Sequence, residues 1–190
     1  MSPKSARGPA RLILGIDPGS AVAGYGLLRV EGQTITALDH GVLRVGRPVA
    51  SFPVVLRRLF EEVEALIERM SPDVVAIEQV FNHLNPRAAL KLAHARGVVL
   101  LAAARAGVEV REYAPRQIKK AAVGVGSAEK RQVQEMLRLL LHLPAADIAL
   151  DASDALAVAL CEAQAFPSRS AIERAANAPL AGKKRPTVRT

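Results

Sequence analysis

The sequence predicts an α/β protein with a mixed central sheet of five strands flanked by helices. Three strand patterns come first, at residues 11–17, 22–30 and 33–46, and the turns between them favour a meander. Strand and helix patterns then alternate, which is typical of α/β proteins. Half of the 190 residues are hydrophobic and 3% are aromatic, so we expect one domain with an aliphatic core.

The later elements follow from hydrophobic spacing and from helix-breaking residues. Apolar side chains recur at helical spacing over 50–70, and Ser71-Pro72 ends that helix. Short buried strands are expected at 73–78 and 108–113. Further helices are predicted at 87–106 with Gly107 as C-cap, at 115–122 and at 151–166. Another helix is expected between a Ser127 cap and Pro144, with Lys130 in its second turn. Its buried face would carry Leu137, Leu140 and Leu141.

Basic residues gather in one central segment and at both ends of the chain. Residues 87–138 hold eleven basic and four acidic side chains, whereas 139–166 hold four acids and no basic residue. We expect a flexible basic arm at 1–10, the folded domain at 11–166 and a disordered basic tail at 167–190. This distribution favours a polyanionic partner, although a solvated basic face explains the central segment about equally well.

Several classes of protein are excluded by composition. A single cysteine, Cys161, is incompatible with a disulfide framework or a cysteine-rich zinc site. The longest uncharged apolar run, at 97–104, is too short to span a bilayer, and the run at 12–16 is too short for a secretory signal. We therefore expect a soluble protein of the cytoplasm.

Four acidic side chains occupy places where α/β proteins build sites. Asp17 and Glu78 each end a buried strand, and strand ends are displayed at the edge of the sheet. Asp151 and Asp154 lie three residues apart on the last predicted helix, so both point the same way and repel each other. Hard oxygen donors of this kind favour one or two Mg²⁺ or Mn²⁺ ions as the compensating charge.

Each acid also has a structural explanation. Asp17 precedes Pro-Gly and could serve the turn, Glu78 could cap the following loop, and Asp151 could be a helix N-cap. Asp154 lies inside the helix and is the hardest to explain in this way.

Five segments, taken together, resemble the RuvC family of bacterial Holliday junction resolvases. They occur in the family's order and cover nearly all of residues 11–165. Each alone is a weak signal, but five in order are specific. They are GIDPGSAVAGYG at 15–26, AIEQVF at 76–81, ALKLAHARGV at 89–98, YAPRQIKKAAVGVGSAEKRQV at 113–133 and DASDALAVAL at 151–160.

The resemblance implies an RNase H-like fold and metal-dependent resolution of four-way DNA junctions by paired nicks in recombination and repair. The metal ligands would be Asp17, Glu78, Asp151 and Asp154, holding two Mg²⁺ or Mn²⁺ ions. It also implies a homodimer, the RuvA–RuvB branch-migration complex as partner, and a place beside the nucleoid in the bacterial cytoplasm. The apolar helix at 87–106 is a candidate dimer surface, although core packing explains it equally well.

The resemblance also implies which residues contact DNA. Lys130 would lie beside the acids and stabilise charge on the phosphoryl oxygens. Lys119 would contact the junction strands, and Arg87 and Arg116 would be further DNA contacts. Phe81 lies three residues beyond Glu78, where the family carries an aromatic that stacks on a base near the crossover. Burial in the core is the ordinary expectation for a phenylalanine.

Three other functions can be weighed against this one. An actin-like ATPase also opens with a strand and an Asp-x-Gly turn, but it needs a second phosphate loop and about twice this length. A ribonuclease H would share the acids but not the five segments. A junction-binding protein without activity would need only the basic residues, which leaves the four acids unexplained.

Overall fold

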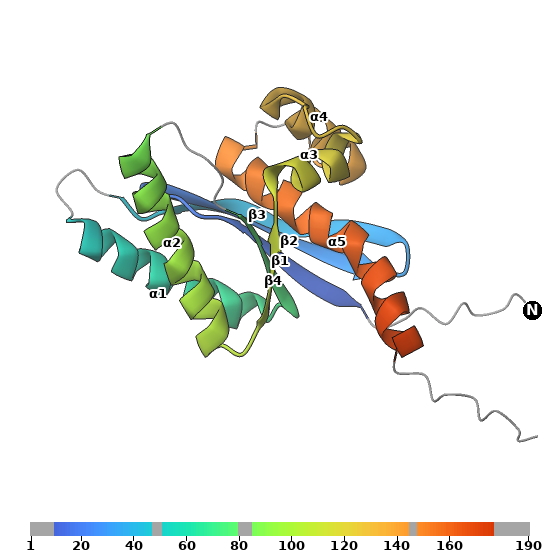
Figure 1. Cartoon of the computed structure of the whole chain (residues 1–190), viewed down its shortest axis with the longest axis horizontal. Helices are drawn as coiled ribbons and strands as arrows, with labels where there is room; N and C mark the ends of the chain where they lie inside the picture. Colours follow the sequence, from blue (N-terminus) through green and yellow to red (C-terminus); the bar gives the residue numbers. More distant parts are fainter. Residues whose placement is uncertain (1–9, 47–50, 80–84, 145–147, 177–190) are drawn as a thin grey trace, which may run out of the picture.

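One mixed five-stranded sheet forms the centre of the molecule, in the order β3-β2-β1-β4-β5 (Figure 1). The computed structural model describes residues 10–46, 51–79, 85–144 and 148–176. The first three strands pair antiparallel, whereas β4 pairs with β1 and β5 pairs with β4 in parallel, so the mixed sheet that the sequence predicted is confirmed. The strands are β1 (Arg11–Asp17), β2 (Val22–Glu31), β3 (Thr34–Arg44), β4 (Val74–Glu78) and β5 (Glu109–Tyr113).

Helices cover both faces of the sheet and make three layers (Figure 1). Two of them pack together on one face, and the other face is covered by the last helix with the two shorter ones beside it. The helices are α1 (Phe52–Met70), α2 (Pro86–Arg105), α3 (Pro115–Val123), α4 (Lys130–Leu140) and α5 (Leu150–Ala176). Among the described residues, no helix is long and apolar enough to cross a membrane.

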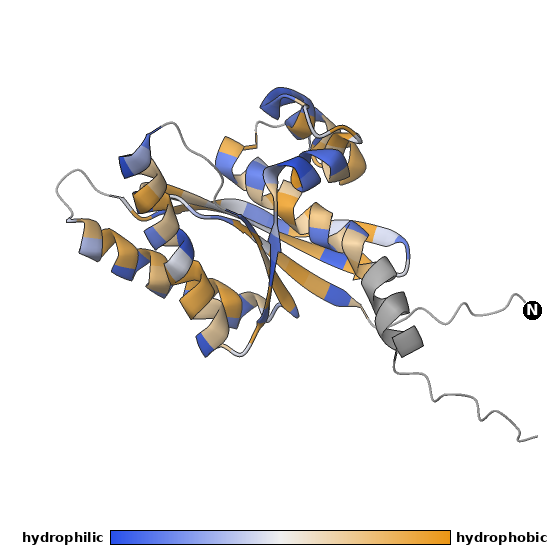
Figure 2. Ribbon diagram, viewed as in Figure 1, coloured by the Kyte–Doolittle hydropathy of each residue, from blue (hydrophilic) through white to orange (hydrophobic). Residues whose placement is uncertain are grey.

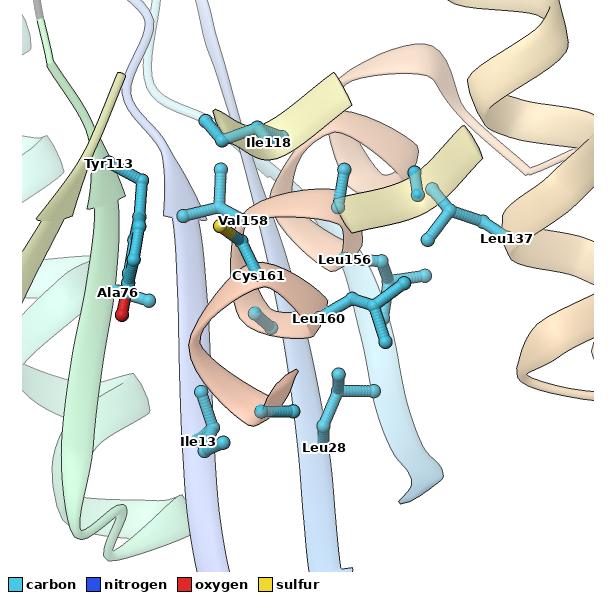
Figure 3. Close-up of a cluster of buried hydrophobic side chains, with 14 of the residues drawn as sticks. Ile13, Leu28, Ala76, Tyr113, Ile118, Leu137, Leu156, Val158, Leu160 and Cys161 are labelled. Atoms are coloured by element: carbon cyan, nitrogen blue, oxygen red, sulfur yellow. The ribbon is translucent and has the colours of Figure 1, made fainter. Parts of the chain in front are cut away.

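Alternation along the central strands divides the core in two. In β1, Ile13 faces α5 while its neighbour Leu14 faces α1 and α2. Both side chains are fully buried because helices cover both faces, and the central strands are hydrophobic along most of their length (Figure 2). Figure 3 shows the α5 side of the core, where Leu156 and Leu160 of α5 lie with Leu28 of β2.

Two predicted helix limits and one predicted core residue are wrong. Helix α4 begins at Lys130, after a turn that contains Ser127, and the Glu129 amide is satisfied by Gln132 Oε1 at 2.9 Å. Lys130 is therefore the first helical residue and does not lie in the second turn. Leu140, predicted to be buried, is 44% exposed.

Helix α5 also runs past the predicted end at 166. It continues through Pro167 to Ala176, so residues 167–176 are not the disordered tail that the sequence predicted. A proline removes one intrahelical hydrogen bond and can kink a helix without ending it. The residues that follow include several strong helix formers, which favour continuation. The expectations for an N-terminal arm and for a tail at 177–190 fall outside the described residues.

Candidate active site

Two of the four acids lie side by side at the carboxyl end of the sheet. Asp17 ends β1 and Glu78 ends β4, and these strands are parallel with Ile16 in register with Ile77. Both carboxylates follow buried strand residues, and both residues are half-buried. The strand ends therefore present two acids to one edge of the sheet, as predicted.

Glycines in the sheet bring α5 and its acids to this edge. Gly24 of β2 is the register partner of Asp17, and a Cβ at Gly24 would lie 1.8 Å from the carbonyl oxygen of Asp151. A Cβ at Gly15 would lie 2.1 Å from the carbonyl oxygen of Ala155. The first turns of α5 therefore rest directly on the strand backbones, a close approach that only glycine permits.

The charges of the other three acids converge on Asp17. The pKa of Asp17 is raised to about 7, mostly by burial and then by the charges of Asp154, Glu78 and Asp151, in that order of size. Lys130 acts in the opposite direction on the same pKa. The structure thus brings together the four acids selected from the sequence. Asp151 lies within the first turn of α5, after Leu150, and is not its N-cap.

Lys130 lies beside the acids at the start of α4. Its Nζ donates a hydrogen bond to Oδ2 of Asp154 at 2.7 Å, although 72% of the lysine side chain is exposed. That hydrogen bond is the largest cause of a raised Lys130 pKa, and the charges of Asp154, Asp17 and Glu78 add to it. The lysine is therefore held in its charged form between the acids and the solvent.

A small pocket of 80 Å³ opens beside Glu78, Asp154 and Lys130. Lys119 also lines it, because α3 begins two residues after β5 ends and carries this lysine back toward Glu78. Apolar side chains complete the lining, namely Pro115, Ile118, Val133 and Ala157. The pocket therefore has both signs of charge on an otherwise apolar wall.

The remaining predicted DNA contacts lie outside this pocket. Arg116 is exposed on α3, one turn before Lys119. Arg87 is exposed in the first turn of α2, where its amide donates to Asn85 Oδ1 at 3.0 Å. This N-cap was not predicted from the sequence, although Asn before Pro at a helix start is a recognisable signal. Phe81 falls within residues 80–84, outside the described residues.

A larger hollow of 960 Å³ lies between edge strand β3 and residues 140–144. Its lining includes Asp39, His40 and His142 but none of the four acids. The volume of a pocket therefore does not identify the candidate active site, whereas the convergence of the four acids does.

The donor set matches a hard divalent cation in its chemistry. It consists of four carboxylates, and burial together with the charges of the other three raises the pKa of Asp17 to about 7. In the described part of the chain, however, no three His, Cys, Asp or Glu side chains are arranged to hold a metal ion, and one oxygen of Asp154 is bonded to Lys130. The residues fit the ion by type and charge, with Lys130 holding one of the carboxylates.

Comparison with known proteins decides the family. The family model described as "Crossover junction endodeoxyribonuclease RuvC" matches residues 13–162. The chain belongs to the RuvC family. All four acids and both pocket lysines lie within the matched residues, and the resemblance predicted from five segments is confirmed.

Relatives of this family are similar over most of the chain. The chain is 48% identical over 150 residues to the RuvC of Heliobacterium modesticaldum, covering 79% of this chain and 92% of that relative. It is 49% identical over 153 residues to the RuvC of Marinobacter nauticus, covering 80% and 85%.

A solved RuvC structure has the same fold. Thermus thermophilus RuvC in complex with a Holliday junction substrate matches with a TM-score of 0.76 and 34% identity, covering 85% of this chain and 96% of the other. The RNase H-like fold implied by the resemblance is therefore confirmed.

Proposed function

We propose that this chain is a divalent-metal-dependent endonuclease that resolves four-way DNA junctions by paired nicks. The observation that carries the proposal is the convergence of Glu78, Asp151 and Asp154 on the half-buried Asp17, within the part of the chain that matches the RuvC family. Four neighbouring carboxylates repel one another unless a cation binds between them. A divalent cation bound in this way can promote hydrolysis of a phosphodiester.

Two Mg²⁺ or Mn²⁺ ions would be held by Asp17, Glu78, Asp151 and Asp154. When bound, the ions supply an activated water and stabilise the leaving 3′ oxygen. Asp17 ends the central strand, and the charges of all three other acids raise its pKa. This position supports Asp17 as a ligand that the ions would share. The products expected from the family are a 5′ phosphate and a 3′ hydroxyl.

Lys130 would change partner as the site fills. Its Nζ donates to Oδ2 of Asp154, so Lys130 would have to release that oxygen for Asp154 to hold an ion. The exposed lysine side chain then reaches outward, where it donates to a phosphoryl oxygen of DNA. Lys119 on the same pocket supplies a second positive charge to the phosphate.

Junction DNA would extend from this pocket across the basic helices. Arg116, one turn from Lys119, supports a footprint along α3, and Arg87 at the start of α2 would bind a more distant phosphate. Phe81 would stack on a base near the crossover, which Phe81→Ala tests by changing 2-aminopurine fluorescence without lowering the melting temperature.

A second copy of the chain would pack on α2. One side of α2 is buried against the core, but five small or apolar residues on the opposite side are exposed at heptad spacing. They are Leu90, Ala93, Gly97, Leu101 and Ala104. A two-fold dimer through this stripe would supply two active sites for a junction with two-fold symmetry. The partnership with RuvA–RuvB remains an expectation from the family.

A comparison of substrates tests the proposal. With Mg²⁺, the protein should nick a labelled mobile four-way junction in preference to linear duplex, an RNA–DNA hybrid or ATP. Preferential cleavage of the hybrid would favour a ribonuclease H, and ATP hydrolysis would favour an actin-like ATPase. Tight junction binding with no nick in Mg²⁺ or Mn²⁺ would favour a binding protein without activity.

A further inference from the structure

A buried hydrogen bond joins strand β5 to helix α5. The Tyr113 hydroxyl donates to Oε2 of Glu162, which has no solvent exposure. The tyrosine is also buried, and its ring runs along β4 with the hydroxyl beside Ala76 (Figure 3). Burying a carboxylate among apolar side chains is unfavourable unless it is hydrogen-bonded or paired. The position of Glu162 within an apolar stretch of α5 therefore calls for a functional explanation.

Each partner in this bond is linked to an acid of the active site. Tyr113 is the register partner of Glu78, and its carbonyl accepts a hydrogen bond from the Gln79 amide at 2.9 Å. Glu162 follows Asp154 on the same helix by eight residues, about 12 Å along its axis. The bond therefore connects β5, the strand that pairs with the strand of Glu78, to the helix of Asp154.

Arg11 extends the connection to the strand that carries Asp17. It is the first residue of β1, and its Nη2 lies 3.9 Å from Oε1 of Glu162. The same guanidinium lies over the Phe166 ring of α5, 4.3 Å from the centroid. Glu162 of α5 thus has partners on β1 and on β5, the neighbour of β4, while repulsion among the acids acts to separate these elements at the other end.

We propose that Tyr113 and Glu162 are positioning residues that hold α5 against β4 and β5, so that Asp151 and Asp154 stay within reach of an ion bound by Asp17 and Glu78. The inference rests on the metal site proposed above. Neither residue touches the ion or the DNA. Their bond sets the spacing of the ligands, and its loss weakens ion binding more than it slows the loaded enzyme.

Metal titration of Tyr113→Phe tests this role. We expect the full-length variant to bind Mn²⁺ three- to ten-fold more weakly than the wild type in calorimetry without DNA. Junction cleavage should need a correspondingly higher Mn²⁺ concentration but approach the wild-type rate at saturation. Glu162→Gln keeps the size and an acceptor for the tyrosine, so it should retain more of the affinity than Glu162→Leu.

Ile67→Val is the matched control, because it removes one methyl group from the buried face of α1 on the opposite side of the sheet. It should lower the melting temperature without changing Mn²⁺ affinity. If the wild type binds Mn²⁺ and Tyr113→Phe binds it equally well, the bond only stabilises the fold and the positioning role is wrong. If the wild type binds no Mn²⁺, the proposed metal site itself is wrong.

Discussion

Gly24 lies directly beneath the backbone of Asp151, so close that a Cβ on the glycine would be 1.8 Å from the Asp151 carbonyl oxygen. Because Gly24 pairs with Asp17 in the sheet, this contact sets how near the acids of α5 come to the acid of β1. The active site therefore depends on the lack of a side chain at Gly24 as much as on the four carboxylates.

Gly24→Ala should separate α5 from the sheet. The added methyl group meets rigid backbone, so we expect a loss of about 1–3 kcal/mol in the free energy of unfolding. Cleavage should fall further than stability alone explains, because Asp151 and Asp154 move away from Asp17. Chemical denaturation and junction cleavage at saturating Mg²⁺ measure the two effects. Wild-type values in both would show that α5 does not rest on Gly24.

Asp17→Asn and Asp154→Asn should each abolish junction cutting while junction binding is retained or becomes tighter. Removal of a ligand charge disables the metal site and also reduces the repulsion of phosphates. Glu62→Gln, on the exposed surface of α1, is the matched control and should leave both unchanged. Parallel loss of binding and cutting in the two aspartate variants would identify these acids as structural.

The stability of the metal-free protein should fall as pH rises toward and through 7. The Asp17 pKa is raised from 3.8 to about 7 in the fold, so the folded state favours the protonated acid. This contribution is fully present below pH 3.8 and is lost as the pH rises through 7, at most about 4 kcal/mol. With EDTA, the melting temperature of Asp17→Asn should exceed that of the wild type by a margin that grows from pH 5 to 8.

Mg²⁺ should reverse this pH effect in the wild type alone. An ion that binds the folded state stabilises it, and it binds best when Asp17 is ionised. At pH 8, millimolar Mg²⁺ is therefore expected to raise the wild-type melting temperature and to leave Asp17→Asn nearly unchanged. Equal responses of the two proteins would argue against Asp17 as a ligand.

Junction affinity should fall steeply with salt, because basic side chains displace counterions from DNA phosphates. Lys119→Ala should reduce the slope of log affinity against log salt by about one unit. Arg57→Ala, an exposed residue of α1, is the control and should keep the wild-type slope. If the Lys119 variant also keeps that slope, this lysine lies outside the DNA footprint.

The sequence predicted the parts of this protein that follow from local pattern. Strand ends at Asp17 and Glu78 were visible because buried strands are apolar runs that stop abruptly. Gly24 was missed because its meaning depends on α5, which is distant in the sequence. The course of α5 past Pro167 could not be predicted from local pattern, because proline disfavours a helix and only the helix formers after it favour continuation.

Long-range polar contacts were the other features that local pattern did not reveal. The bond between Tyr113 and Glu162 joins residues 49 positions apart, and nothing in either segment indicates which residue is the partner. The contact of Lys130 with Asp154 likewise depends on the place where α4 begins, which was predicted too early.

Cleavage of a labelled mobile four-way junction with Mg²⁺ and with EDTA tests the central claim most directly. The account predicts paired, symmetric nicks with 5′ phosphate and 3′ hydroxyl ends in Mg²⁺, which DNA ligase can seal, and no nick in EDTA. Nicks that persist at the same rate in EDTA, or a junction left intact by protein that binds it in Mg²⁺ and in Mn²⁺, would contradict it.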